Sequence, residues 1–134
     1  ISNIHIAYQA ATVALARAGA LSISELAAVQ LPAILVPYPY AADNHQQHNA
    51  ALLADAGGAV IIDDAELDGG SFATRLDSLL TGDSAVREEM RRALARVARS
   101  DAGAAICDDI ESILGKRGDG FSSPEQPLGG EEGR

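Results

Sequence analysis

The stretch TVALARAGALSISELAAVQLPAILV, residues Thr12–Val36, contains two short apolar runs on either side of an amphipathic segment. Thr12–Ala16 and Ala33–Val36 are brief and include β-branched residues, which is typical of buried strands. Ser22–Val29 has the apolar spacing of a helix that covers one face of a sheet. A strand, a helix and a second strand in this order predict a βαβ unit, in which the two strands are parallel.

A third apolar run and a second helical segment continue this alternation. Ala59–Ile62 has the same strand character, and Asn44–Asp55 is a helical segment that stops at Gly57 and Gly58. Strands that alternate with helices predict an α/β fold with a parallel sheet covered on both faces. Because three parallel strands leave an open edge, we expect further strands before Ile1.

The second half of the chain is predicted to be helical. Apolar residues recur there at helical spacing in three sets, which are Phe72, Leu76, Leu79 and Leu80; Val86, Met90, Leu94 and Val97; and Ile106, Ile110, Ile113 and Leu114. From about Gly115 the composition changes to Gly, Pro, Ser and Glu, which bury too little apolar surface to order a chain. We therefore expect an ordered unit over residues 1–115 and a disordered tail over residues 116–134.

The composition disfavours several classes of partner. The 134 residues carry a formal net charge of −9 without a basic block, so a nucleic acid bound through its phosphates is not expected. No apolar run approaches the roughly 18 residues that predict a membrane-spanning helix. Cys107 has no cysteine partner in the chain, which fits a reducing compartment, and we expect it to be a small buried apolar residue. Ile1 is not an initiator methionine, so we expect a fragment.

The segment RAGALSISELA, residues Arg17–Ala27, is the first candidate site. Gly19 permits a sharp turn from strand to helix, and the spacing of Ser22 and Glu25 predicts a capping box at the helix start. The same geometry suits an anion such as a diphosphate on the first N–H groups, with the carboxylate of Glu25 accepting hydrogen bonds from ribose hydroxyls. Arg17 would assist a phosphate or cap the end of the strand. The residue types alone leave these alternatives open.

The segment VPYPYAADNHQQHNA, residues Val36–Ala50, is the second candidate site. It also runs from a strand end to a helix start, with Asp43 or Asn44 as the expected N-cap. Its first helical turns carry neutral hydrogen-bonding groups on Gln46, Gln47 and Asn49. Such groups suit the hydroxyls of a sugar, and the alternative is a solvated helix start.

The histidines and arginines have ordinary structural interpretations. His45 and His48 are spaced to share a metal, but no third ligand accompanies them, so no metal site is expected. His5 is expected to be structural or exposed. The arginines of the later helical segment alternate with Glu88 and Glu89 and indicate a solvated helix face; they are Arg87, Arg91, Arg92, Arg96 and Arg99.

Taken together, the two candidate segments resemble the MurG family of bacterial glycosyltransferases, within glycosyltransferase family 28. The resemblance covers Ile1 to about Gly115. It implies a GT-B fold of two Rossmann-like domains, with this chain as the latter part of the C-terminal, donor-binding domain. The implied reaction is an inverting transfer of N-acetylglucosamine from UDP-N-acetylglucosamine to a lipid-linked muramyl-pentapeptide in peptidoglycan synthesis. Another UDP-sugar transferase of this fold, such as a glycolipid synthase, and a non-catalytic nucleotide-binding module are the alternatives.

The resemblance also implies roles for individual residues. The family motif that binds UDP-N-acetylglucosamine matches Ala20, Leu21, Ser22, Ile23, Ser24 and Glu25. The backbone at Leu21 and Ser22 would meet the diphosphate, and Glu25 would hold the ribose, so that the helix cap is also the donor site. Gln46, or its neighbour Gln47, would contact the sugar hydroxyls. Arg17, Gly19 and Asn49 are further candidates.

The chain departs from the family pattern, and some family features lie outside it. Ala18 stands where Ser is common, Ser22 replaces Thr, and Gln30 replaces a usual Gly. The family's catalytic residue, uracil pocket and acceptor site precede this segment, so no catalytic residue is expected here and the fragment alone should be inactive. The implied location is peripheral, on the cytoplasmic face of the bacterial inner membrane, and no cofactor is implied.

Overall fold

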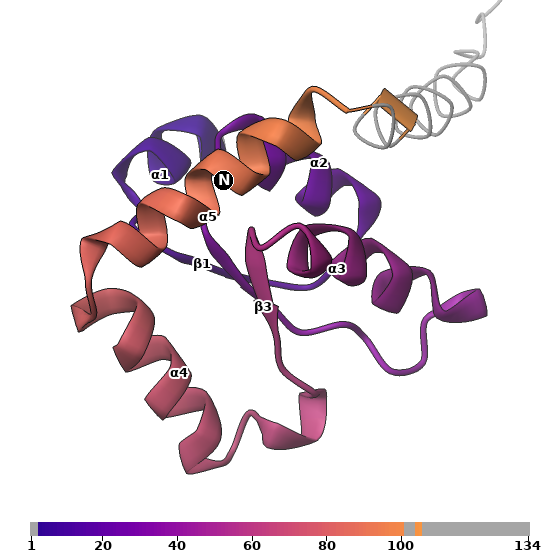
Figure 1. Ribbon diagram of the computed structural model, residues 1–134. Helices are drawn as coiled ribbons and strands as arrows, with labels where there is room; N and C mark the ends of the chain where they lie inside the picture. The colour runs from indigo at the N-terminus through magenta and orange to yellow at the C-terminus, as the bar shows by residue number, and fades with distance from the viewer. Residues whose placement is uncertain (1–2, 101–103, 106–134) are drawn as a thin grey trace, which may run out of the picture.

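A three-stranded parallel sheet forms the centre of the computed structural model, which describes residues 3–100, 104 and 105 (Figure 1). The strands are β1 (Ala14–Ala16), β2 (Ala33–Leu35) and β3 (Ala59–Ile61), in the order β1-β2-β3. Ala14 pairs with Ala33, and Ala33 pairs with Ala59. The predicted parallel strands are confirmed. Each is slightly shorter than expected, although Val36 and Ile62 still donate backbone bonds to neighbouring strands.

A helix precedes the first strand, and further helices follow each strand, the latter as predicted. They are α1 (Ile4–Ala10), α2 (Ala20–Ala28), α3 (His45–Asp55), α4 (Gly70–Thr81) and α5 (Ser84–Ala98), with short 3₁₀ turns η1 (Ala42–Asn44) and η2 (Asp64–Glu66). The third predicted helical set, residues 106–114, lies outside the described residues. So do Cys107 and the tail over residues 116–134.

The two faces of the sheet are covered by different sets of helices, and α5 contributes to both. Ala33 and Leu35 pack in one cluster with residues of α2, α3 and α5, whereas Ile34 between them packs in a second cluster with Leu79 of α4 and Met90 of α5. This alternation is the two-residue period of a strand buried on both faces. In Figure 1, α1, α2 and α5 lie together at the top of the view and α4 lies below them.

Two members of the apolar sets on α4 and α5 lie outside the core. Leu80 is 46% exposed and Val86 is 52% exposed, while Leu79 and Met90 are buried. Successive helical residues differ by about 100° in direction, so the narrow second cluster reaches Leu79 but not Leu80. Val86 lies in the first turn of α5, about one turn before Met90, the first buried residue of that helix.

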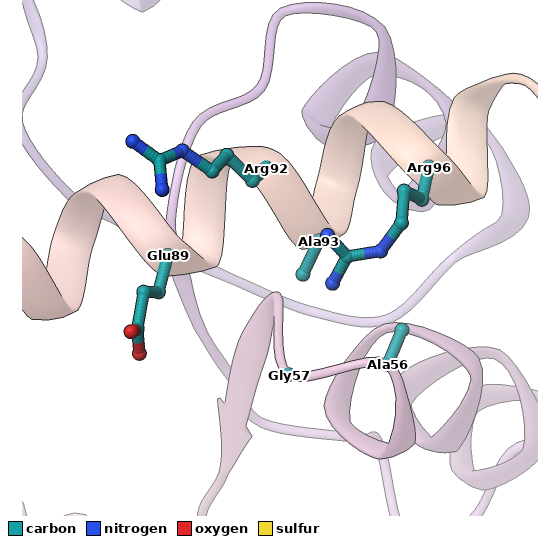
Figure 2. A pocket seen from close by; sticks show the side chains of 6 residues that line it. All are labelled: Ala56, Gly57, Glu89, Arg92, Ala93 and Arg96. Atoms are coloured by element: carbon teal, nitrogen blue, oxygen red, sulfur yellow. The ribbon is translucent and has the colours of Figure 1, made fainter.

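The turn between α3 and β3 depends on its two glycines. Gly57 has a φ of 88°, a left-handed conformation that favours glycine, and so confirms the predicted helix stop. A Cβ on Gly58 would lie 2.6 Å from Cδ2 of Leu94, so the turn and α5 are in direct contact. An open hollow of about 360 Å³ lies beside this contact (Figure 2), lined by Ala56, Gly57, Glu89, Arg92, Ala93 and Arg96. None of these residues belongs to a candidate segment.

Arg87 is not part of a solvated face, contrary to the prediction. Its Nη1 atom donates to the carbonyl oxygens of Leu79 at 2.7 Å and of Leu80 and Gly82 at 3.3 Å. These are unpaired carbonyls at the end of α4, where a positive charge also complements the helix dipole. Arg87 therefore fastens the start of α5 to the end of α4. Arg92, which lies 3.7 Å from Glu88, is exposed as expected.

Candidate functional site

The two candidate segments meet at one edge of the sheet. Arg17–Gly19 follows β1 and Val36–Ala41 follows β2, and the two strands are parallel neighbours. The carboxyl ends of parallel strands lie at the same edge, which is the usual ligand-binding edge of open α/β sheets. Both candidate segments therefore lie at the edge where ligands bind in such sheets.

The helix at the first segment begins earlier than predicted. Gly19 is the N-cap of α2, its φ and ψ are −66° and 151°, and its carbonyl oxygen accepts from the N–H of Ile23 at 3.0 Å. Ser22 is thus inside the first turn, and no side chain caps the helix, so the predicted capping box is wrong. The chain enters α2 directly after buried Ala18, because the carbonyl of extended Gly19 already accepts the first hydrogen bond of the helix. Gly19 needs no left-handed backbone.

This early start leaves backbone N–H groups without helical partners at the N-terminus of α2. The N–H groups of Ala20, Leu21 and Ser22 come before the first residue that bonds within the helix, and no side chain occupies the position that would cap them. A Cβ on Gly19 would meet no atom within 4 Å, so the space before the helix is open. An uncapped helix start that faces open space is a site suited to an anion.

The other matched residues of α2 have different surroundings. Ile23 is fully buried, and its N–H is already bonded, so its side chain contributes to the core. Leu21 is 53% exposed, and Ser24 is partly buried.

Glu25 has a partner that the sequence did not indicate. The hydroxyl of Tyr8, on α1, donates to Oε2 of Glu25 at 2.8 Å. Both side chains are partly buried, and Tyr8 packs against the main core cluster. Burial raises the pKa of Tyr8, and the hydrogen bond to Glu25 and its negative charge raise it further. Tyr8 therefore stays protonated and able to donate. No spacing rule links residues on separate helices, so sequence reasoning had no signal for this pair.

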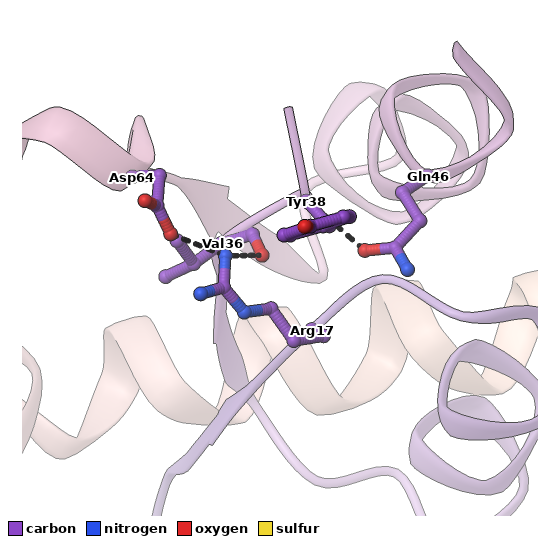
Figure 3. A network of polar contacts seen from close by, with 5 residues as sticks. All are labelled: Arg17, Val36, Tyr38, Gln46 and Asp64. Carbon is purple, nitrogen blue, oxygen red and sulfur yellow. Dashed lines mark hydrogen bonds and ion pairs between the residues drawn. The ribbon is translucent and has the colours of Figure 1, made fainter. Parts of the chain in front are cut away.

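Asn49 and Gln46 hold the two segments in place. The Nδ2 group of Asn49 donates to the carbonyl oxygen of Ala18 at 3.1 Å, which ties α3 to the turn before α2. Oε1 of Gln46 accepts from the N–H of Tyr38 at 2.8 Å (Figure 3). The donor end of Gln46, its Nε2 group, points away from Tyr38. Gln47 is exposed.

Arg17 connects the ends of all three strands. Its Nη1 atom donates to the carbonyl oxygen of Val36 at 3.4 Å and forms an ion pair with Asp64, which follows β3 (Figure 3). Its guanidinium lies 5.7 Å from the centre of the Tyr38 ring. Arg17 is expected from the sequence to assist a phosphate or to cap the end of the strand, and these contacts show it at the strand ends. A small hollow of about 190 Å³ adjoins it, lined by Leu15, Ala16, Arg17, Val36 and Leu67.

The start of α3 differs from the predicted side-chain cap. Asn44 occupies the N-cap position, but it and Asp43 have φ values of 53° and 54°, and no side chain makes a capping bond. Asn and Asp are among the non-glycine residues that most often adopt this left-handed backbone. His45 lies 3.9 Å from Asp43 on the surface. Within the described part of the chain, no group of three or more His, Cys, Asp or Glu residues is arranged to hold a metal ion.

Comparisons with known proteins match most of this chain. A family model described as glycosyltransferase family 28 C-terminal domain matches residues 1–105. A relative from Nitratidesulfovibrio vulgaris is 41% identical over 124 residues, covering 88% of this chain and 32% of the relative. Another, from Methylococcus capsulatus, is 48% identical over 107 residues, covering 79% and 30%. Both are named UDP-N-acetylglucosamine–N-acetylmuramyl-(pentapeptide) pyrophosphoryl-undecaprenol N-acetylglucosamine transferase.

A solved structure has the same fold. The crystal structure of Acinetobacter baumannii MurG matches with a TM-score of 0.66 and 31% identity, covering 84% of this chain and 32% of that one. The chain thus spans about a third of the length of the proteins it matches. Among the described residues, no helix has the length and apolar character required to cross a membrane. From the matched family model, the α/β fold and these relatives, the chain belongs to the glycosyltransferase family 28 C-terminal domain family.

Proposed function

We propose that this chain is the donor-binding part of a longer transferase that acts on UDP-N-acetylglucosamine. The complete enzyme would transfer N-acetylglucosamine to the lipid-linked muramyl-pentapeptide, as the names of its relatives state for those proteins. Residues 1–115 would be the latter part of the donor-binding domain, with residues 116–134 as a tail. Because the chain spans about a third of its relatives, the acceptor site and catalytic base would lie in the rest of the protein.

The open start of α2 would hold the diphosphate of the donor. In the reaction, an acceptor hydroxyl attacks the anomeric carbon from the face opposite the diphosphate, and the configuration inverts. The bond from that carbon to the diphosphate oxygen breaks, its electron pair stays on UDP, and the hydroxyl proton passes to a base. Negative charge then grows on the diphosphate, where the N–H groups of Ala20, Leu21 and Ser22 would stabilise it.

The remaining candidates would bind the ribose and the sugar. Glu25 lies about one helical turn beyond the helix start, and its carboxylate would accept hydrogen bonds from the two ribose hydroxyls. The Nε2 group of Gln46 would donate to a sugar hydroxyl, since Oε1 is engaged by Tyr38, and exposed Gln47 lies beside it. Asn49 would act on the donor through the turn that it holds at Ala18. The complete enzyme would work as a peripheral protein at the cytoplasmic face of the inner membrane.

The observation that carries this proposal is the uncapped start of α2 with a carboxylate one turn further on. If Glu25 holds the ribose, Glu25→Gln in the complete transferase weakens hydrogen bonds to a charged group, which contribute roughly 1.5–3 kcal/mol. We expect the dissociation constant of UDP-N-acetylglucosamine, measured by calorimetric titration, to rise about tenfold to a hundredfold. Glu88→Gln on α5 makes the same chemical change at an exposed position and should leave it unaltered. An unchanged constant for Glu25→Gln would contradict the proposal.

A further inference from the structure

We propose that Tyr8 is a positioning residue, whose hydroxyl holds the carboxylate of Glu25 in the orientation that accepts the ribose hydroxyls. The inference rests on the proposed function, since it needs Glu25 to bind ribose. It adds a residue from a different helix, outside both candidate segments. It also predicts that α1 contributes to recognition of a ribonucleotide.

The contact between Tyr8 and Glu25 is direct and joins two separate elements. The hydroxyl of Tyr8 lies 2.8 Å from Oε2 of Glu25, the length of a good hydrogen bond to an oxygen acceptor. The two residues are 17 positions apart, on α1 and α2. The Tyr8 ring packs against the core cluster that contains Ile23 and Leu26 of α2, so its hydroxyl is fixed relative to that helix.

The hydrogen bond leaves Glu25 able to bind a diol. An ionised carboxylate has about four acceptor positions on two oxygens, and Tyr8 uses one of them. The last torsion angle of a glutamate side chain is broad and poorly defined without a partner. A fixed donor on Oε2 selects one plane for the carboxylate before the ligand arrives. Such preorganisation reduces the loss of side-chain freedom on binding, which otherwise weakens affinity.

Tyr8 is suited to this role because it donates at all physiological pH values. Its pKa is raised by burial first, and then by the hydrogen bond and the charge of Glu25. The hydroxyl therefore stays protonated throughout the physiological pH range. A cation in the same place would also orient the carboxylate, but it would neutralise the charge that strengthens the bonds to ribose.

The test compares Tyr8→Phe with wild type in the complete transferase. Tyr8→Phe keeps the ring and its packing and removes only the hydroxyl. UDP and 2′,3′-dideoxy-UDP, which lacks both ribose hydroxyls, are titrated against wild type, Tyr8→Phe, Glu25→Gln and the double variant. We expect Tyr8→Phe to raise the dissociation constant of UDP about three- to tenfold and to change that of 2′,3′-dideoxy-UDP by less than about twofold. In the Glu25→Gln background it should change UDP by less than about twofold.

Each outcome of this titration supports or overturns the inference. If Tyr8 had only a structural role, Tyr8→Phe would weaken the binding of both nucleotides equally or of neither, and its effect on UDP would persist in the Glu25→Gln background. Any of these results overturns the inference. If Glu25→Gln reduces the preference for UDP over 2′,3′-dideoxy-UDP and Tyr8→Phe does not, only the proposed role of Tyr8 fails. If Glu25→Gln leaves the preference unchanged, Glu25 does not hold the ribose, and that part of the proposed function fails as well.

Discussion

Asn49 is expected to stabilise the turn before α2, and two substitutions test this. Its Nδ2 group donates to the carbonyl oxygen of Ala18, a fully buried residue, at 3.1 Å. A neutral hydrogen bond contributes about 0.5–1.5 kcal/mol, and a buried carbonyl left without a partner costs about 1–3 kcal/mol. Because Asn49 is only partly buried, water can reach part of this site, so we expect Asn49→Ala to lower the free energy of unfolding by about 1–2 kcal/mol.

Asn49→Asp is the sharper variant, because it keeps the shape of the side chain and removes the donor. One carboxylate oxygen would then face the carbonyl oxygen of Ala18, and the two acceptors repel each other. We expect this variant to be less stable than Asn49→Ala, by up to about 1 kcal/mol. It should also bind UDP more weakly, since the new charge lies close to the turn that precedes the diphosphate site.

Urea unfolding of the chain, followed by circular dichroism, measures these differences in the free energy of unfolding. His48→Ala, at an exposed position on the same helix, is the matched control and should stay within about 0.5 kcal/mol of wild type. If Asn49 only contacted a sugar, both variants would be as stable as wild type and only the affinity would fall. That result, or an Asn49→Asp variant as stable as wild type, would refute the reasoning.

Three further predictions concern the packing and the termini of the helices. Gly58→Ala places a methyl 2.6 Å from Leu94 and should lower the free energy of unfolding by about 1–3 kcal/mol. Leu94→Ala should lower it by about 2–5 kcal/mol. The double variant should cost at least about 1 kcal/mol less than the sum in urea unfolding, because the new methyl enters the vacated space; strict additivity would contradict this. Arg87→Ala should lower the free energy of unfolding by about 1–2 kcal/mol, because it releases the end of α4. Arg87→Gln should restore little of this loss, and thermal unfolding of both variants measures the difference. The pKa of Tyr8 in the folded state is raised above its usual 10.0, so the stability that this shift contributes is complete below pH 10 and is lost as pH rises through the folded-state value. The free energy of unfolding should therefore fall less steeply above pH 10 in Tyr8→Phe than in wild type. Parallel curves for the two proteins would argue against this.

The order and type of the elements follow from the sequence. Short apolar runs such as Ala33–Val36 carry enough local signal to predict a strand, because a strand buried on both faces must be apolar throughout. The stop after α3 is equally local, since glycine adopts the left-handed backbone seen at Gly57 without steric cost. Parallel pairing then follows from the helices between the strands, and it places both candidate segments at one edge of the sheet.

The contacts that build the candidate site were decided by the tertiary structure. The spacing of Ser22 and Glu25 predicted a capping box, but α2 begins at Ala20, because Gly19 after β1 already serves as the N-cap. Glu25 bonds instead to Tyr8, and Asn49 bonds to Ala18 across 31 positions. Local patterns describe residues within a turn or two of one another. Which side chain meets which across the fold depends on the packing of whole elements, and that packing is the result of burying all their apolar faces together.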